Sequence, residues 1–196
     1  SEDGTHILQR FTDGSVHTTR TTLMRPGKIS RQIGENETVQ LLPGGELLLI
    51  QKTNGKSSTL EIVDRKTGAV RTTLEPTLAS SERILPTPDG QDYVAAAGGG
   101  NIYVWNVKSG KQRLRLESGG QLNAESLAIT PDGRRLYVTA QPRGLLCWNL
   151  ETGEFISTPA ASINSQTCVV ATPDNRSIVT GATDGKLRIW DRRTGQ

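Results

Sequence analysis

Short apolar stretches alternate with polar turns along most of the chain. Residues 130–140, TPDGRRLYVTA, place a Pro-Asp-Gly turn directly before a strand-like run, and similar phrases begin at Ala171, Pro86, Leu41 and Ser1. The turn position recurs at intervals of 41 to 45 residues and is occupied by Gly4, Gly45, Gly90, Gly133 and Asn175. Asn is the other residue that tolerates a left-handed backbone, so the sequence predicts that conformation at this position.

A second phrase follows each turn. It is GKLRIWDRRTGQ from Gly185, GLLCWNLETGE from Gly144 and NIYVWNVKSGK from Asn101, with a weaker copy, TLEIVDRKTGA, from Thr59. Apolar residues alternate with period two in these copies, which is the signal of a β-strand. In three of the copies a Trp comes next at the same position, and we call these residues the Trp column. Asp or Asn follows, and then a Thr/Ser-Gly pair whose glycine suits a tight hairpin turn. The Trp residues of this column are Trp105, Trp148 and Trp190.

Each repeat therefore predicts four short strands. In the repeat around Gly133 they are 126–130, 135–140, 145–150 and 154–158. Apolar residues at helical spacing are not sustained anywhere, so we expect an all-β protein. A period of 41–45 residues with four strands is typical of a β-propeller, in which stacking buries both faces of each antiparallel blade. We expect one propeller domain over 1–196, with units at 1–37 (partial), 38–82, 83–125, 126–167 and 168–196 (partial).

The repeats resemble the WD40 family. Residues 172–196, TPDNRSIVTGATDGKLRIWDRRTGQ, are similar to the second half of a WD40 unit with its Trp190-Asp191 pair, and Tyr137-Val138-Thr139 resembles the related YVTN propeller repeat. The resemblance implies a hydrogen-bonded set of His, Ser or Thr, Asp and Trp in each blade. The last unit has Thr180, Asp184 and Trp190 in matching places, but neither His6 nor His17 occupies the His position. The repeats are thus divergent WD40-like units with YVTN-like features.

The number of strands bears on ring closure. Five units without the first strand of the first unit and the last strand of the last unit leave eighteen strands, which is not a multiple of four. We expect an incomplete ring or part of a larger propeller, completed by other blades. The alternative is a compact five-bladed ring with one irregular blade.

The composition bears on the class of partner, on the compartment and on the state of the cysteines. The net charge is +3 and the pI about 9.0, but Lys and Arg are scattered and the aromatic residues number only eight, so we expect no nucleic acid partner. No apolar run is long enough for a membrane span, and no signal peptide is visible. The compartment is left open, with a soluble cytoplasmic protein slightly favoured. Two cysteines, Cys147 and Cys168, are too few for a disulfide framework, and we expect both to be free and buried.

Candidate catalytic chemistry is sparse. Gly98-Gly99-Gly100 lacks the Lys-Ser/Thr of a phosphate-binding loop and is expected to be a hairpin tip. His6 and His17 have no third ligand and make a poor metal site. The aspartates of the Pro-Asp turns recur at equivalent places in three units and are expected to cap their own turns; they are Asp89, Asp132 and Asp174. We therefore predict no catalytic residue, no metal site and no cofactor.

Recognition is expected on one rim of the blades, at the loops between second and third strands. The candidate residues of this rim are Lys52, Asn54, Lys56, Gln141, Arg143, Asp184 and Lys186. The WD40 resemblance implies a non-catalytic interaction scaffold that binds protein partners or the remainder of a larger propeller. The alternatives are a YVTN-type propeller enzyme, lactonase or quinoprotein-like, or a sensor domain of a larger protein. The innermost strands look apolar, with almost no ligand residues, which disfavours the enzyme.

Overall fold

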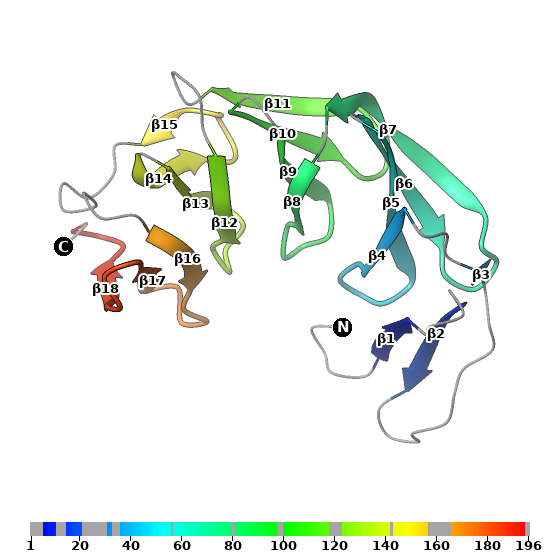
Figure 1. Cartoon of the computed structure of the whole chain (residues 1–196), viewed down its shortest axis with the longest axis horizontal. Helices are drawn as coiled ribbons and strands as arrows, with labels where there is room; N and C mark the ends of the chain where they lie inside the picture. Colours follow the sequence, from blue (N-terminus) through cyan, green and yellow to red (C-terminus); the bar gives the residue numbers. More distant parts are fainter. Residues whose placement is uncertain are drawn as a thin grey trace. The chain divides into compact units, whose positions relative to one another are not determined.

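Antiparallel sheets make up the protein, as a computed structural model shows (Figure 1). The structure describes residues 6–10, 15–20, 31–32, 36–55, 57–79, 81–97, 100–117, 123–141, 143–156 and 166–194. Eighteen strands form five sheets within these ranges, and no described segment is helical. A helix able to cross a membrane is likewise absent from this part of the chain. The protein is an all-β propeller, as predicted, and eighteen is the number of strands that the repeat predicted.

The chain divides into two compact units, of which the first contains two sheets. One sheet has the order β1-β2-β3 and the other the order β4-β5-β6-β7. The strands of the first sheet are β1 His6–Arg10, β2 Ser15–Arg20 and β3 Arg31–Gln32. Those of the second are β4 Glu37–Leu41, β5 Leu47–Asn54, β6 Ser57–Asp64 and β7 Val70–Ala79.

The second unit contains three sheets, two of four strands and one of three. The first sheet is formed by β8 Ser81–Pro86, β9 Asp92–Ala97, β10 Asn101–Asn106 and β11 Gln112–Glu117. The next consists of β12 Asn123–Ile129, β13 Arg135–Gln141, β14 Gly144–Asn149 and β15 Phe155–Ile156. The last contains β16 Gln166–Ala171, β17 Ser177–Ala182 and β18 Leu187–Asp191. The first strands of these sheets, β8, β12 and β16, are neighbours.

The turn between first and second strands folds as the sequence predicts. Gly133 has φ 71° and Asn175 has φ 62°, the one positive φ of a non-glycine residue in the described part of the chain. In the turn at Gly133, the Asp132 Oδ1 atom accepts hydrogen bonds from the Thr130 hydroxyl at 2.5 Å and the Arg134 backbone N–H at 3.0 Å. Asp89 and Asp174 accept the same two bonds in their own turns, which confirms that these aspartates cap their turns.

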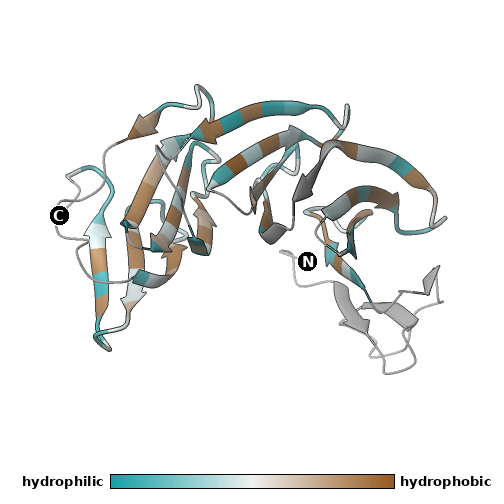
Figure 2. Cartoon of the chain, turned by 45° about the horizontal axis from the view of Figure 1, so that its top comes forward, coloured by the Kyte–Doolittle hydropathy of each residue, from teal (hydrophilic) through white to brown (hydrophobic). Residues whose placement is uncertain are grey.

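The central strands of the second unit are mostly apolar (Figure 2), and β13 and β14 are buried along nearly their whole length, so this sheet offers apolar side chains on both of its faces. Trp148 is fully buried in a cluster that joins β9 and β10 to β12–β14 and includes Leu127 and Leu136. Trp190 is buried in a second cluster that joins β12–β14 to β16–β18. The predicted burial of Trp148 and Trp190 against an adjoining sheet is therefore confirmed.

Candidate functional site

A β-bulge recurs near the start of the first strand in all three sheets of the second unit. The register of β8 with β9 shifts between Ser81 and Arg83, and that of β12 with β13 shifts between Ala124 and Ser126. The register of β16 with β17 shifts at the same place. The extra residues of the three bulges are Glu82, Glu125 and Thr167. A bulge re-aims the neighbouring side chains, and bulges are frequent next to binding sites.

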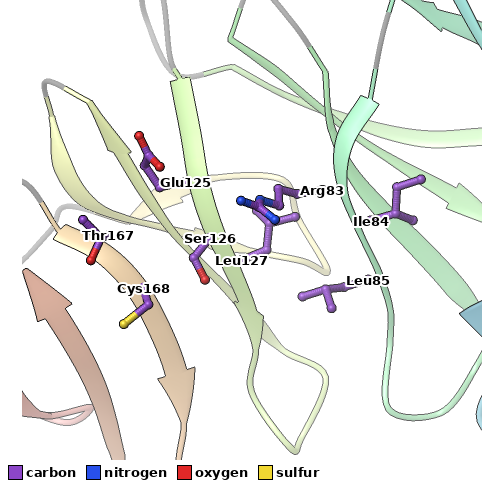
Figure 3. Close-up of a pocket in the computed structure, with 8 residues that line it drawn as sticks. All are labelled: Arg83, Ile84, Leu85, Glu125, Ser126, Leu127, Thr167 and Cys168. Atoms are coloured by element: carbon purple, nitrogen blue, oxygen red, sulfur yellow. The ribbon is translucent and has the colours of Figure 1, made fainter. Parts of the chain in front are cut away.

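The bulged ends of these strands line one pocket of about 500 Å³ (Figure 3). The strand β8 contributes a cation and two aliphatic side chains, β12 an acid, a hydroxyl and a leucine, and β16 a hydroxyl and a thiol. These residues are Arg83, Ile84, Leu85, Glu125, Ser126, Leu127, Thr167 and Cys168. Arg83, Ser126 and Cys168 each follow the bulge, so they occupy equivalent positions of the repeat. These positions place a guanidinium, a hydroxyl and a thiol in one pocket.

The hydroxyl groups of the pocket also hold its wall together. Ser126 Oγ accepts a hydrogen bond from the Val169 backbone N–H at 3.3 Å, which ties β12 to β16. The Thr167 hydroxyl donates to the Gly181 carbonyl at 3.3 Å. The Ser126 hydroxyl proton has no acceptor within the described part of the chain and can donate to a ligand.

The two charged groups of the pocket have opposite signs. Arg83 is exposed and extends from β8 toward β12 in Figure 3, and Glu125 is half-buried on β12. Neither forms an ion pair with a side chain that the structure describes. The site thus combines an Arg donor fork, a carboxylate, hydroxyl groups and an aliphatic wall, which together suit polar recognition of a partner beside apolar contact.

The sequence pattern did not predict this pocket. The innermost strands are not purely apolar, because their polar residues precede the apolar core of each strand. The signal in the sequence was present: SERILP, NAESLAI and QTCVVA each begin with polar residues. What the sequence did not show is the bulge, which turns these residues into the pocket. The strand β4 has no such shift in its pairing with β5, so the bulge is not a necessary property of the repeat.

Six of the seven predicted rim residues are described by the structure, and they lie in or near second-to-third strand hairpins. In the first unit, Lys52 Nζ lies 2.6 Å from Glu61 Oε1, and Asn54 is exposed at the end of β5. Lys56 and the Gly98-Gly99 pair lie outside the described residues. The described candidates are thus distributed over three hairpins, β5–β6, β13–β14 and β17–β18.

The rim residues of the second unit occupy two hairpins. Gln141 and Arg143 are exposed at the β13–β14 turn. Asp184 is exposed at the β17–β18 turn, and Lys186, also exposed, donates its backbone N–H to Asp184 Oδ1 at 3.1 Å. The Arg188 side chain donates to Asp184 at 2.5 Å and lowers the pKa of this carboxyl to about 2. Their role in binding stays a prediction.

The cysteines differ from one another. Both are free, but only Cys147 is buried, whereas Cys168 is exposed at the edge of the pocket. The prediction that both are buried was therefore wrong for Cys168, because this residue lines the open pocket. Burial raises the pKa of the Cys147 thiol to about 11.

Metal and imidazole chemistry have little support in the described residues. No group of three His, Cys, Asp or Glu side chains in that part of the chain could hold a metal ion. His6 lies on β1 and His17 on β2, two paired strands in which His6 is opposite Arg20 and His17 is opposite Gln9. The two histidines are thus not a cross-strand pair.

Comparison with known proteins decides the family. The family model described as outer membrane protein assembly factor BamB matches residues 70–196. The chain belongs to this family of β-propeller repeats. Autophagy-related protein 16 of Arabidopsis thaliana is 25% identical over 195 residues, which cover 97% of this chain and 37% of the relative. The chain thus spans little more than a third of the length of that relative.

Proposed function

We propose that this propeller is a non-catalytic protein-interaction module and that the pocket on β8, β12 and β16 is a contact site for its partner. The observation that carries the proposal is the pocket itself, in which Arg83 and Glu125 lie beside Ser126 and an aliphatic wall. Interfaces combine such an apolar patch with polar groups that fix orientation, and arginine is enriched at their energetic centres.

The chemistry of the pocket defines the segment that it accepts. An acidic side chain or terminal carboxylate of the partner would pair with the Arg83 guanidinium. An aliphatic side chain would contact Leu85 and Leu127, and a carbonyl oxygen would accept the Ser126 hydroxyl proton. A short, extended peptide segment with an acid next to an aliphatic residue meets these requirements.

The predicted rim belongs to the proposal as a second, broader contact surface. Those of its residues that the structure describes lie in or near hairpins that the sheets hold in place; the candidates are Lys52, Asn54, Lys56, Gln141, Arg143, Asp184 and Lys186. Loops on a rigid scaffold are where recognition residues concentrate. The family is described by the name of an assembly factor, and assembly requires contact with other proteins, which supports a binding role.

The WD40 subtype is also part of the proposal. Inside the last sheet, the Trp190 Nε1–H donates to Thr180 Oγ1 at 2.9 Å in a buried position, as the WD40 resemblance implies. Asp184 is instead paired with Arg188 on the surface. One of the expected hydrogen bonds is therefore present, in a repeat without the His that would complete the set.

The proposal is tested by affinity capture with two arginine variants of the same charge change. Arg83→Glu reverses the charge in the pocket, whereas Arg134→Glu reverses it on an exposed turn of the same unit, outside the pocket. The immobilised protein is incubated with native extract, and bound proteins are quantified by mass spectrometry. We expect partners that the wild type and Arg134→Glu retain and Arg83→Glu loses.

Two results would contradict this function. If the three proteins capture the same partners in the same amounts, the pocket is not the contact site. If the purified wild type instead hydrolyses lactones or oxidises alcohols and Arg83→Glu abolishes turnover, the enzymatic alternative holds. Denaturant unfolding of both variants checks that each is folded.

A further inference from the structure

Two fully buried polar side chains beside the pocket lack hydrogen-bond partners in the described part of the chain. Gln166, the first residue of β16, is completely buried, and neither its Nε2 nor its Oε1 atom has a partner among these residues. The hydroxyl of Thr139 on β13 is equally buried and equally unpartnered there. A buried polar group without a hydrogen bond destabilises a fold, so a reason other than stability is needed for this pair.

Strand pairing places both side chains at the junction between β12–β15 and β16–β18. Gln166 pairs with Ala182, which lies on the same face of β17 as Ile178, a member of the cluster that joins the two sheets. Thr139 lies two residues after Tyr137, a member of the same cluster, so it faces this junction from the other sheet. The two unpartnered groups therefore belong to one interface.

The same residues adjoin the wall of the pocket. Thr167 and Cys168 follow Gln166 directly along β16, and both line the pocket (Figure 3). Ser126, the cross-strand partner of Thr139, lines it as well. Rotation about the side-chain bonds of Gln166 can bring its carboxamide toward the pocket, and this rotation breaks no side-chain hydrogen bond to a described residue.

The neighbouring junction shows that the repeat does not require polar groups at these positions. Thr139 and Ala96 are each the sixth residue after the glycine of their turn, and Ala96 is buried in the cluster that joins β9 and β10 to β12–β14. Gln166 directly precedes the bulge of β16, as Ala124 precedes that of β12, and Ala124 packs against the same cluster as Ala96. A local choice that costs stability in one copy of a repeat is expected at a functional site.

The chemistry of the unpaired carboxamide selects its ligand. A primary carboxamide carries an N–H donor and a carbonyl acceptor on one edge, so Gln166 forms two parallel hydrogen bonds with a group that has the same pair. A peptide unit does not match, because in its trans form the N–H and the C=O point in opposite directions. The side chain of an asparagine or a glutamine meets the requirement.

We propose that Gln166 is a specificity-determining residue of the pocket, whose carboxamide turns outward and pairs with an Asn or Gln side chain of the partner segment. This inference rests on the proposed function, because it adds a residue to the segment that the pocket accepts. Binding gains two hydrogen bonds and breaks none that the Gln166 side chain forms with described residues. The space that the carboxamide vacates admits water, which can supply the Thr139 hydroxyl with a partner.

The probe is a library of hexapeptides capped by acetyl and N-methylamide groups, which add no primary carboxamide. An Asp-Leu or Leu-Asp pair is fixed at the centre, and the two positions on each side are varied. Immobilised protein captures the library, and mass spectrometry measures the enrichment at each varied position. We expect the wild type to enrich Asn or Gln over Ala at one position by about tenfold, the factor that two ordinary hydrogen bonds provide.

Two variants separate recognition from stability. Gln166→Met keeps a side chain of similar length without the carboxamide, and it should abolish the enrichment of Asn and Gln while capture of the Asp-Leu core remains. Thr139→Val is the matched control, since it removes the other unpaired group of the same junction and should leave the enrichment unchanged. Both variants should raise the urea midpoint of the free protein, because each removes a buried polar group without a described partner.

The outcomes distinguish this inference from the proposed function. If capture depends on Arg83, as Arg83→Glu shows, but the wild type does not prefer Asn or Gln, the pocket still binds peptides and the role of Gln166 is overturned. If Gln166→Met and Thr139→Val each lower the urea midpoint, the two side chains bond to one another in solution, which also overturns it. If the wild type captures no peptide, the proposed function fails, and this inference fails with it.

Discussion

The sheets β12–β15 and β16–β18 have nearly the same sequence pattern and different surroundings. In β12–β15 both faces are covered, one in the cluster with β9 and β10 and the other in the cluster with β16–β18. In β16–β18 the Trp190 face is covered and the Leu187 face is exposed. The period-two pattern thus assigns a residue to a face, whereas the neighbouring sheet decides whether that face is buried.

The largest effect is expected at the centre of the sheet that is covered on both faces. Trp148→Ala should lower the free energy of unfolding by about 3–5 kcal/mol, as for other large-to-small core changes. The indole is fully buried, its Nε1–H lies 3.4 Å from the Glu117 carbonyl, and its ring contacts Phe155 edge-on at 5.3 Å. Urea unfolding measures the change, and a loss under about 1 kcal/mol would show that the Trp column is not core.

Two leucines at equivalent positions provide the most direct comparison. Leu145→Ala should cost about 2–5 kcal/mol, because it leaves a cavity between two sheets. Leu187→Ala should change the free energy of unfolding by about 0.5 kcal/mol or less, because Leu187 is mostly exposed. Both are measured by the same urea titration. Equal costs at the two positions would mean that another part of the molecule covers the Leu187 face in solution.

The pH dependence of stability should differ between Asp132 and Asp174. Burial raises the pKa of Asp132, but hydrogen bonds from Thr130 and Asn175 and the nearby Arg192 outweigh it, so the pKa lies below its ordinary value. The Thr172 hydroxyl lowers the pKa of Asp174. A lowered carboxyl pKa contributes stability that is complete above the unfolded-state pKa of 3.8 and is lost as the pH falls toward the folded-state pKa.

The free energy of unfolding of the wild type should therefore fall below about pH 4, and Asp132→Asn should reduce this fall more than Asp174→Asn does. The reason is that only Asp132 has partners on a neighbouring sheet in addition to those in its own turn. Thermal unfolding of the wild type and both variants over this pH range measures the difference. Identical pH profiles for the two variants would contradict a junction role for Asp132.

The smallest perturbation is chemical modification of the thiols. In native protein Cys168 should react with iodoacetamide well before Cys147, because Cys147 is buried and its pKa is raised to about 11 by that burial. Both should react after unfolding. Mass spectrometry of the alkylated peptides separates the two sites. A starting mass two hydrogens below that of the reduced chain would instead show a disulfide, contrary to the structure.

Local geometry explains what could be predicted. The turn before each second strand requires a left-handed residue and an aspartate that accepts two local hydrogen bonds, and both requirements are visible in a few consecutive letters. The strands around Gly133 were predicted at 126–130, 135–140 and 145–150, and they lie at 123–129, 135–141 and 144–149. The predicted 154–158 is observed as Phe155–Ile156 within the described residues.

The candidate site was harder to predict, because it depends on pairing between strands. The bulges at Glu125 and Thr167 are properties of the register of β12 with β13 and of β16 with β17. Polar residues before an apolar run do not show by themselves that three such runs will lie side by side. Arg83, Glu125 and Cys168, far apart in the chain, were therefore not recognised as one pocket.

The sequence by itself determined the period, the turns, the strands, the all-β class and the burial of Trp148 and Trp190, because each depends on local backbone preference or on alternation within a repeat. Only the tertiary structure decided which of two equivalent apolar faces is covered, where the bulges collect polar side chains, and that Cys168 is exposed while Cys147 is buried. These features depend on the register between strands and on the presence of a neighbouring sheet, and neither is encoded within a single repeat.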